Sequence, residues 1–520
     1  MKREILTKKE KRSIIFLKDL KERGKNMNFS EVIKENVSRT YTENGAKAYN
    51  TTGDKLLDLF STAGALRTRS EDEIREKFKL AFDENPLLAT KLLFYTGNIR
   101  GGLGERRTFK ICLKWLAAEH PEIVIKNIAL IPEFNRWDSI FELMDTPAEN
   151  TMWTFIAETI TNDISNLTVA KLMNSEPHIS LLAKWLPSEN ASSRKTRNLA
   201  RKVISRLGVT PKKYRQFLSI LRAQLKIVEK SMSAKEWNKI NYSGVPSYAM
   251  KNYRNAFCRH DEKRFSEFID SVKKGEKKIN ASTLFPYDII HQYTSDQNWI
   301  FSANNYDEVL EQQWRALPNY VKDDSEVLVM ADTSGSMYGR PMETSVGLAI
   351  YFAQRNKGIY HNTFMTFSSD PQYFYINEGA SLQSNINKVA HSPWGMSTNL
   401  TGAMEKILQD AVANNIKPEE MPKALVVISD MEIDYCARDN WDYSDALSLK
   451  FEAVGYKMPK LVFWNVESRN DTFLTKGKNT VLVSGQSPST FRSVLKTIDM
   501  TAYEAMLEVL NDPMYDCVKI

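Results

Sequence analysis

Residues 327–336 read Val327-Leu-Val-Met-Ala-Asp332-Thr-Ser334-Gly-Ser336, and this stretch decides the fold of the C-terminal half of the chain. Five consecutive apolar residues lead directly into an aspartate and two serines, which is the pattern of a buried strand that ends in a polar turn. A second apolar run, residues 424–429, leads in the same way into Asp430. Because the ligand sites of parallel α/β sheets lie beyond the carboxyl ends of the strands, we expect the two aspartates to meet there.

The polar side chains that follow these runs form a candidate metal site. Two serines share the turn with the first aspartate, and a threonine lies in the later segment Gly395-Met-Ser-Thr-Asn399. An all-oxygen set with few carboxylates suits Mg²⁺ or Mn²⁺, which prefer octahedral coordination and keep some of their waters. Asp and Ser also favour turns and helix caps for local reasons, but the strand context and the order of the later residues favour a metal. The predicted ligands are Asp332, Ser334, Ser336, Thr398 and Asp430.

Strand-like and helix-like segments alternate from about residue 304 to the end of the sequence. This alternation predicts an α/β domain with a mostly parallel, doubly wound sheet. The expected strands are Val327–Asp332, Thr363–Phe367, Tyr373–Ile376, Ala424–Ser429, Leu461–Val466 and Thr480–Ser484. The expected helices are Met342–Arg355, Leu400–Asn414, Ser489–Lys496 and Ala502–Leu510.

The residues before about 300 read as helices joined by short links. Thr210 and Pro211 have the form of an N-cap followed by proline at the first helical position, and Gly208 is a suitable end for the preceding helix. Antiparallel helix pairs of this kind are typical of a solenoid of HEAT or armadillo type. We expect an all-α helical-repeat domain over residues 1–300, followed by the α/β domain over residues 301–520. The apolar face of the helix that begins at Pro211 is predicted at Tyr214, Phe217, Leu218, Leu221, Leu225 and Val228.

The composition excludes several classes of protein. An apolar content of 42% over 520 residues is enough for two or more packed domains. The cysteines are scattered without a C-x-x-C pair, so neither a disulfide framework nor a zinc site is indicated. No apolar run is long enough for a signal segment or a membrane span, so we expect no membrane association and a cytoplasmic location. The cysteines are Cys112, Cys258, Cys436 and Cys517.

The charge is distributed unevenly along the chain. Residues 171–285 hold about 25 Lys and Arg against about 9 Asp and Glu, whereas residues 301–520 hold about 19 against about 28. A basic segment of this size indicates a surface for a polyanion such as RNA, and the alternative is a set of solvated helix faces. Arg and Lys suit phosphates, and interleaved aromatic residues can stack on unpaired bases. The predicted RNA contacts here are Lys212, Lys213, Arg215, Arg222, Arg254, Arg259, His260 and Arg264.

The segment Arg100-Gly-Gly-Leu-Gly-Glu-Arg106-Arg107 is rich in both glycine and arginine. It lacks the Lys-Ser/Thr ending of a P-loop. Two interpretations stay open. Backbone N–H groups between the helices could bind an RNA phosphate with Arg100, Arg106 and Arg107 adding charge, or the glycines could form a tight turn between two helices.

The metal pattern resembles the metal-ion-dependent adhesion site of von Willebrand factor A domains, whose fold is Rossmann-like. Such a domain after a basic helical repeat resembles the TROVE-module ribonucleoproteins, the Ro family, and further motifs resemble an uncharacterised TROVE-like branch. The resemblance covers about residues 50–500, by motif. The motifs are residues 98–106, 135–138, 182–187, 245–250, 257–261, 428–434, 462–465 and 483–485.

The resemblance carries expectations about fold and partners. It implies a ring-like helical domain that the A domain closes, with small structured noncoding RNA or single-stranded RNA as the ligand. It also implies a protein partner that donates a carboxylate to the open position on the metal. Asn399 departs from the family, in which an aspartate often follows the threonine. Glu432 and Asp434 add negative charge near Asp430 and would favour a cation.

These observations favour binding over catalysis. No histidine base, nucleophile motif or nucleotide-binding loop accompanies the predicted ligands, so we expect no enzymatic activity. RNA binding by a Ro-like ribonucleoprotein is the favoured function. The alternatives are a metal-dependent protein adhesion or assembly module and a metal-dependent RNA phosphodiesterase.

Overall fold

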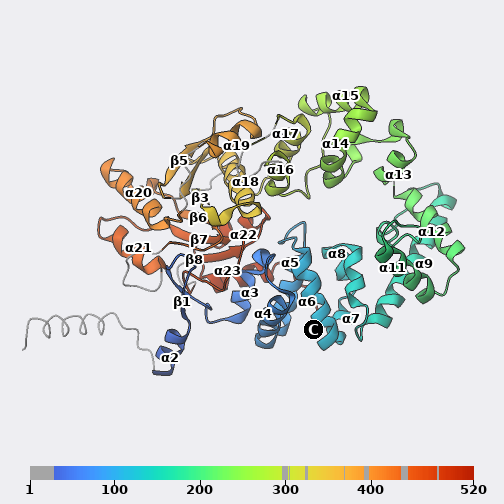
Figure 1. Ribbon diagram of the computed structural model, residues 1–520, viewed down its shortest axis with the longest axis horizontal. Helices are drawn as coiled ribbons and strands as arrows, with labels where there is room; N and C mark the ends of the chain where they lie inside the picture. Colours follow the sequence, from blue (N-terminus) through green and yellow to red (C-terminus); the bar gives the residue numbers. More distant parts are fainter. Residues whose placement is uncertain are drawn as a thin grey trace, which may run out of the picture.

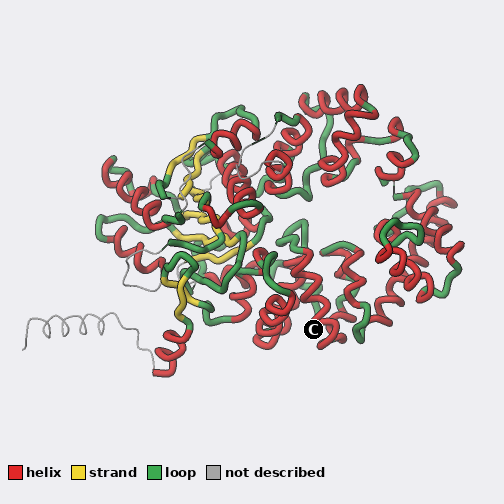
Figure 2. The backbone as a smooth tube through the Cα atoms, in the orientation of Figure 1, coloured by secondary structure: helices red, strands yellow, loops and turns green. Residues whose placement is uncertain are grey.

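A computed structural model describes residues 29–225, 227–294, 303, 305–321, 326–367, 369–391, 397–434, 443–476 and 480–520. The chain consists of a long arc of helices and a domain built on a β-sheet (Figure 1). Both ends of the arc rest on the sheet domain, so that the chain closes on itself, in agreement with the ring-like arrangement that the resemblance implies (Figure 2). The predicted domain boundary at residue 300 falls outside the described residues.

The first part of the arc is a series of short helices with clear sequence signals at their starts. Ser70 accepts a hydrogen bond from the Glu73 N–H, and the Glu73 carboxylate bonds back to Ser70, which is a capping box. Asn85 caps the next helix, whose first residue is Pro86. The helices are α2 (Phe29–Val37), α3 (Lys55–Phe60), α4 (Glu71–Glu84), α5 (Pro86–Gly97), α6 (Arg106–Glu119), α7 (Pro121–Lys126) and α8 (Leu130–Phe134).

The middle of the arc contains the helix that was predicted in most detail. Thr210 accepts a hydrogen bond from the Lys213 N–H at 3.2 Å, and Gly208 has φ of 62°, so the predicted cap and the predicted helix end are both confirmed. The helix stops at Gln224, and Val228 begins a separate helix, so the predicted apolar face was too long. The elements here are η2 (Trp137–Leu143), α9 (Glu149–Met173), α10 (Leu182–Trp185), α11 (Arg194–Arg206) and α12 (Pro211–Gln224).

The last part of the arc returns to the sheet domain. The Trp314 indole N–H donates to Gln354 Oε1 at 2.7 Å, and Arg355 donates to the Trp314 carbonyl at 2.9 Å, which ties the end of the arc to the domain. The helices are α13 (Val228–Ser233), α14 (Ser247–His260), α15 (Glu262–Lys273), α16 (Pro286–Thr294) and α17 (Glu308–Arg315).

A six-stranded sheet forms the centre of the C-terminal domain, with strand order β5-β4-β3-β6-β7-β8. All neighbouring strands pair in parallel except β5, which runs antiparallel to β4 at the edge. The predicted mostly parallel sheet is therefore confirmed. The strands are β3 (Val327–Asp332), β4 (Thr363–Phe367), β5 (Gln372–Tyr375), β6 (Ala424–Ser429), β7 (Lys460–Asn465) and β8 (Thr480–Ser484).

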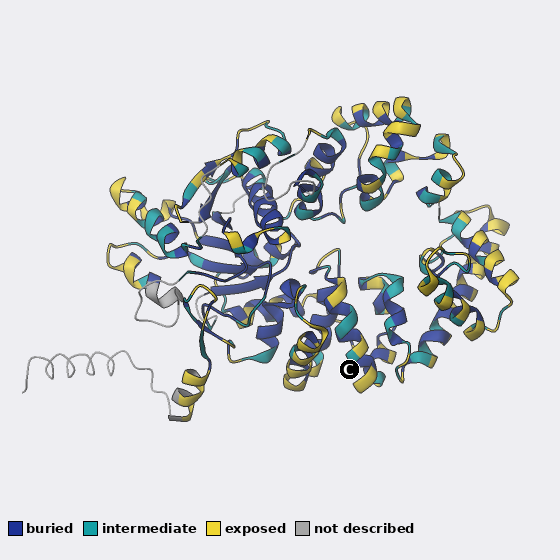
Figure 3. Cartoon of the chain, in the orientation of Figure 1, coloured by how far each residue is buried: buried dark blue, intermediate teal, exposed yellow. Residues whose placement is uncertain are grey.

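Helices cover both faces of this sheet. Alternate residues of β3 point to opposite sides: Leu328 and Met330 belong to one hydrophobic core, and Val327 and Val329 belong to the other. Each core also contains residues from one end of the arc, which explains why burial is continuous across the junctions (Figure 3). The helices of the domain are α18 (Arg340–Arg355), α19 (Leu382–Ala390), α20 (Leu400–Ala413), α21 (Tyr443–Glu452), α22 (Thr490–Lys496) and α23 (Ala502–Leu510).

A small hairpin near the start of the chain joins the helical arc to the sheet domain. Strands β1 (Arg39–Tyr41) and β2 (Lys47–Tyr49) pair with each other, and Tyr49 exchanges two backbone hydrogen bonds of 2.8 Å with Phe473. A little further on, the Gly64 N–H donates to Ser484 Oγ at 2.9 Å. From the sequence, no strand was predicted between Arg39 and Tyr49.

The last residues of the chain pack on the first helices of the arc. The Asn127 side chain bonds the Lys519 backbone in both directions, at 2.5 Å and 2.9 Å, and Asn98 Nδ2 donates to the Tyr515 hydroxyl at 3.2 Å. Both terminal parts of the described chain therefore hold the sheet domain against α3 to α8. No helix among the described residues is long and apolar enough to span a bilayer.

Candidate metal centre and basic arm

Asp332 is the last residue of β3 and is completely buried. Its Oδ1 accepts a hydrogen bond from the Ser334 N–H at 2.9 Å, and its Oδ2 accepts one from the Ser429 hydroxyl at 2.6 Å. The adjacent strand β6 pairs with β3 in register, Ala331 opposite Ile428, so Asp430 emerges beside Asp332 at the same edge. The parallel strand order thus places the two predicted carboxylates together, as expected.

The two aspartates are held in an environment that disfavours their negative charge. Burial raises the pKa of Asp332 above its usual range, and the neighbouring charge of Asp430 raises it further. Burial likewise raises the pKa of Asp430, although the nearby Arg469 guanidinium acts in the opposite direction. A pair of buried carboxylates of this kind is stabilised when a cation lies between or beside them.

The hydroxyls of the turn connect the aspartates. Ser336 lies in the short helix η5 (Gly335–Met337), and Ser334 directly precedes it. Their Oγ atoms are 3.2 Å apart. The Ser336 hydroxyl also bonds the Asp430 carboxylate, which partly offsets the rise that burial causes in the pKa of that group. Four of the five predicted ligands are therefore linked to one another by hydrogen bonds in a single cluster.

Thr398, the fifth predicted ligand, lies in the loop before α20. Its N–H donates to Asp434 Oδ2 at 2.8 Å, and the Asp434 N–H donates to the Thr398 carbonyl at 3.2 Å, which fixes the loop next to the segment after Asp430. The side chain is completely buried, and its Oγ1 has no hydrogen-bond partner among the described residues. A buried hydroxyl without a partner is costly, and an ion or its bound water would satisfy it.

The residues present fit a small hard cation. They supply carboxylate and hydroxyl oxygens only, and Thr398 Oγ1 is left without a partner, as a ligand position requires. No group of three or more His, Cys, Asp or Glu side chains suited to a metal occurs in the described part of the chain, so the fit rests on two carboxylates and hydroxyls. Metal binding by these residues stays a prediction.

Arg469 is a functional candidate that the sequence reading missed. It lies in the loop after β7, and its Nη2 is 2.5 Å from Asp430 Oδ2. The same nitrogen donates to the Ser336 carbonyl. No motif surrounds this arginine in the sequence, and the only available signal was a cation just beyond the carboxyl end of a parallel strand.

The two acidic residues expected to attract a cation, Glu432 and Asp434, also serve structural roles. Glu432 accepts a hydrogen bond from the Glu43 N–H at 2.6 Å and others from Asn470 and Thr472, so its carboxylate holds the N-terminal hairpin. Asp434 holds the Thr398 loop. Asn399 caps α20 by accepting from the Gly402 N–H at 2.9 Å, a role that an aspartate could also fill.

The glycines of this segment form a tight turn, and the backbone N–H groups before α6 are engaged within the chain. Each N–H from Arg100 to Glu105 is bonded within the chain, with Asn98, Tyr95 and Thr96 supplying the acceptors. A Cβ at Gly102 would lie 2.1 Å from the Tyr95 carbonyl oxygen, which explains the glycine. The turn interpretation is therefore confirmed for residues 100–105, whereas phosphate binding by Arg100, Arg106 and Arg107 stays a prediction.

Asn98 organises this turn and yields a testable prediction. Its buried Oδ1 accepts from the Arg100 N–H at 2.9 Å and from the Gly101 N–H at 3.2 Å. Asn98→Ala should lower the free energy of unfolding by about 2 kcal/mol, because it removes both acceptors and leaves buried polar groups unpaired. Urea denaturation measures the change, with Asn414→Ala on the surface as the control. A loss no larger than that of the control would contradict the assigned role.

The predicted RNA contacts are spread along the arc. Arg100, Arg106 and Arg107 are exposed near the start of α6, whereas the others lie on or near α12 and α14, at distant places in Figure 1. Lys212, Lys213, Arg215, Arg259 and His260 have exposed side chains. We call residues 171–285, which include α11 to α15, the basic arm.

Arg222, Arg254 and Arg264 are among the predicted contacts that already have partners within the chain. Arg222 donates to the carbonyls of Ala183 and Leu186 at 2.8 Å and 2.6 Å. Arg254 donates to Asp307 Oδ2 at 2.6 Å, and Arg264 donates to two backbone carbonyls. These guanidinium groups stabilise turns and helix ends, and their predicted contact with a phosphate stays a prediction.

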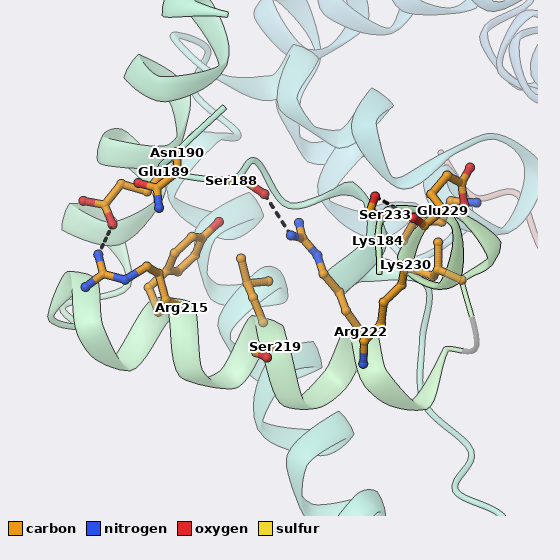
Figure 4. A pocket seen from close by; sticks show the side chains of 13 residues that line it. Lys184, Ser188, Glu189, Asn190, Arg215, Ser219, Arg222, Glu229, Lys230 and Ser233 are labelled. Carbon is orange, nitrogen blue, oxygen red and sulfur yellow. Dashed lines mark hydrogen bonds and ion pairs between the residues drawn. The ribbon is translucent and has the colours of Figure 1, made fainter. Parts of the chain in front are cut away.

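A groove of about 710 Å³ opens between α10, α12 and α13 of the basic arm (Figure 4). Arg215 pairs with Glu189 at one end, and Arg222 donates to Ser188 Oγ at 2.8 Å. Lys184 and Lys230 also line it and have no ion-pair partner among the described residues. Four cationic side chains thus face one groove, two of which the sequence reading did not name. The lining is completed by Asn190, Tyr214, Leu218, Ser219, Ile227, Glu229 and Ser233.

Comparisons with known proteins place most of the chain in families without an assigned function. An uncharacterized protein, L728 of Acanthamoeba polyphaga mimivirus, is 28% identical over 514 residues, which cover 91% of this chain and 87% of that protein. The crystal structure of the Deinococcus radiodurans Ro (RSR) protein is similar with a TM-score of 0.33 and 13% identity, covering 80% of this chain and 92% of that one.

Two families match consecutive parts of the sequence. A family described as Domain of unknown function (DUF7788) matches residues 326–514, which hold the sheet domain. A family described as Domain of unknown function (DUF2828) matches residues 42–136 and 150–327, which are more than half of the chain. The chain therefore belongs to the DUF2828 family.

Proposed function

We propose that this chain is an RNA-binding protein whose basic arm contacts the phosphates of structured or single-stranded noncoding RNA. The observation that carries the proposal is the groove between α10, α12 and α13, because Lys184, Arg215, Arg222 and Lys230 all line it. The groove lies on a segment with a surplus of about 16 positive charges. The positive side chains of such a segment repel one another in a folded domain, and an anionic ligand relieves the repulsion.

The side chains that would reach the phosphates are those without strong partners in the chain. Lys184 and Lys230 fulfil this condition in the groove, and Lys212 and Lys213 are exposed on the adjacent face of α12. The Arg215 side chain is half exposed and pairs with Glu189. Such an ion pair is weak in water, so Arg215 can exchange Glu189 for a phosphate. Arg222 instead shapes the groove by holding residues 183–188.

The experiment is an electrophoretic shift titration of the full chain at two salt concentrations. The probes are a single-stranded RNA and a stem-loop RNA of equal length. The triple variant Lys184→Gln, Arg215→Gln, Lys230→Gln should bind both probes more weakly, with a salt slope shallower by about 2 on logarithmic axes, because about 0.7 is lost per phosphate contact on single strands. The matched control neutralises three exposed lysines of the sheet domain, Lys417, Lys457 and Lys496.

The outcome separates the proposal from its main alternative. A protein-binding solenoid with a solvated basic face predicts no measurable RNA affinity at physiological salt for any variant. Equal binding by the triple variant and the control would mean that the groove is not the RNA surface. Weaker binding of the triple variant alone supports the groove.

The proposal extends to the architecture and the metal. We assign the arc as a HEAT-like helical repeat and the sheet domain as a von Willebrand factor A-type domain, as the resemblance to the TROVE-module family implies. Asp332, Ser334, Ser336, Thr398 and Asp430 would hold Mg²⁺ or Mn²⁺. When bound, such an ion offers a coordination position to an oxygen ligand, for which we propose a carboxylate of a protein partner.

We assign this site to binding and not to hydrolysis. The contacts of Asp332 and Asp430 with described residues come from serines, backbone groups and Arg469. None of these groups is a histidine or a further carboxylate that could serve as a general base beside the metal ligands. Metal-dependent RNA turnover that is lost in Asp430→Ala would overturn this assignment.

A further inference from the structure

Arg469 places a positive charge on the carboxylate that the proposed metal would need. Its Nη2 lies 2.5 Å from Asp430 Oδ2 and also donates to the Ser336 carbonyl. Asp430 is almost completely buried, whereas the Arg469 side chain is about one third exposed. The guanidinium therefore enters the cluster from the solvent side and contacts one of the two aspartates.

The backbone of the Arg469 loop is fixed. The Ser468 N–H donates to the Ala65 carbonyl at 2.8 Å, and the Thr68 hydroxyl donates to Glu467 Oε1 at 2.6 Å. The guanidinium of Arg69 donates to the carbonyl of Arg469 itself. Because these three contacts from the N-terminal segment hold the loop, we expect Arg469 to leave the cluster by a rotation of its side chain.

A second acceptor lies within reach of such a rotation. Arg469 Nη1 is 4.0 Å from Glu43 Oε2, and the Glu43 carboxylate is half exposed. The carboxylate is itself positioned, because Asn470 Nδ2 donates to its Oε1 at 2.7 Å. A guanidinium that leaves Asp430 thus finds a carboxylate on the solvent side without any movement of the loop.

We propose that Arg469 is an internal competitor for the metal: it neutralises Asp430 in the metal-free protein and moves to Glu43 when a divalent cation binds. The inference rests on the metal site proposed above. A divalent ion and a guanidinium on the same carboxylate repel each other strongly at these distances. The cation that the buried aspartates require is therefore supplied by the chain itself until a metal replaces it.

Calorimetric titration of the full chain with Mn²⁺ tests the competition. Arg469→Gln should bind Mn²⁺ about tenfold more tightly than the wild type, because the competing cation is gone and the site is more negative. Lys457→Gln, which removes an exposed charge from the same domain, is the control and should bind as the wild type does. Arg469→Lys retains the charge without the forked geometry and should lie between the two.

A double-mutant cycle tests the move to Glu43. Glu43→Gln should weaken Mn²⁺ binding in the wild-type background and leave it unchanged in the Arg469→Gln background. If Glu43 acted only through its general negative charge, the loss would be the same in both backgrounds. The acceptor for Asn470 is retained in this variant, so the loop stays in place.

The possible outcomes separate this inference from the proposed metal site. Mn²⁺ binding that is equal or weaker in Arg469→Gln contradicts the competition while leaving the metal site standing. Absence of binding in both the wild type and Arg469→Gln contradicts the site and the inference together. If Arg469→Gln is less stable without metal, the rise of its Tm with saturating Mn²⁺ should exceed that of the wild type, because a tighter ligand stabilises more.

Discussion

Replacement of Asp332 is expected to abolish Mg²⁺ and Mn²⁺ binding while the chain stays folded. The side chain provides one of the two carboxylates of the cluster, and a site with a single carboxylate and hydroxyls has too little negative charge to hold a divalent ion. The fold should survive because burial, and after it the like charge of Asp430, already disfavours the ionised form of Asp332. Calorimetric titration with Mn²⁺ measures the loss, and the Tm reports the fold.

Two further variants make this result specific. Asp332→Asn keeps an oxygen acceptor for the Ser334 N–H and should also lose the metal, whereas Asp370→Ala, on the surface of the same domain, should bind normally. Retention of wild-type affinity in Asp332→Ala or Asp332→Asn would show that the predicted ligands do not form a metal site.

Gly64→Ala should strongly destabilise the chain at the junction of the arc with the sheet domain. A Cβ at this position would lie 2.5 Å from the Gly485 Cα and 2.6 Å from the Gly485 nitrogen, and both are backbone atoms that cannot turn away. The strand and the helical segment would have to separate at the junction of the arc with the sheet domain. We expect a loss of about 3 kcal/mol in the free energy of unfolding, at the upper end of the usual cost of overpacking.

Gly244→Ala is the matched control for this prediction. Its Cβ would meet the Asn241 side chain at 3.7 Å, an ordinary contact, so the stability should hardly change. Urea denaturation of both variants gives the comparison. Similar stabilities for the two would mean that the Gly64–Gly485 approach does not hold the arc to the sheet.

Short, continuous apolar runs explain why the sheet could be predicted well. The runs that became β3, β4, β6 and β8 are bounded by polar or turn residues, and their predicted limits agree with the structure. The hairpin of β1 and β2 was not predicted, because each strand has only three residues. Phe473, which pairs with Tyr49 of β2, lies more than 400 positions away in the sequence. Pairing over such a distance leaves no local pattern to read.

In the candidate site too, residues with a local sequence pattern could be predicted, and a contact that depends on distant residues could not. Asp332, Ser336 and Asp430 could be predicted because chemistry and strand order coincide in the sequence. The contact of Arg469 with Asp430 depends on a loop that distant residues such as Ala65 and Arg69 hold in place. No rule about spacing along the chain could supply that contact.

Charge counts predicted a basic surface but not which cations are available. Arg222 and Arg264 were chosen because of their charge and position on a helix, yet both donate to backbone carbonyls at the ends of other elements. Lys184 lies in α10, far from α12 in the sequence. Only the packing of α10 against α12 brings it to the groove. Whether a cationic side chain is free to bind a phosphate depends on the tertiary contacts that it makes.

The most direct test of RNA binding is ultraviolet crosslinking of the full chain to RNA in cells, followed by mapping of the crosslinked peptides. RNA should be attached to peptides of the basic arm, residues 171–285, with the strongest signal around Lys184, α12 and Lys230. Sequencing of the attached RNA would identify the ligand. Crosslinks confined to the sheet domain, or no RNA above the level of an untagged control, would contradict the account.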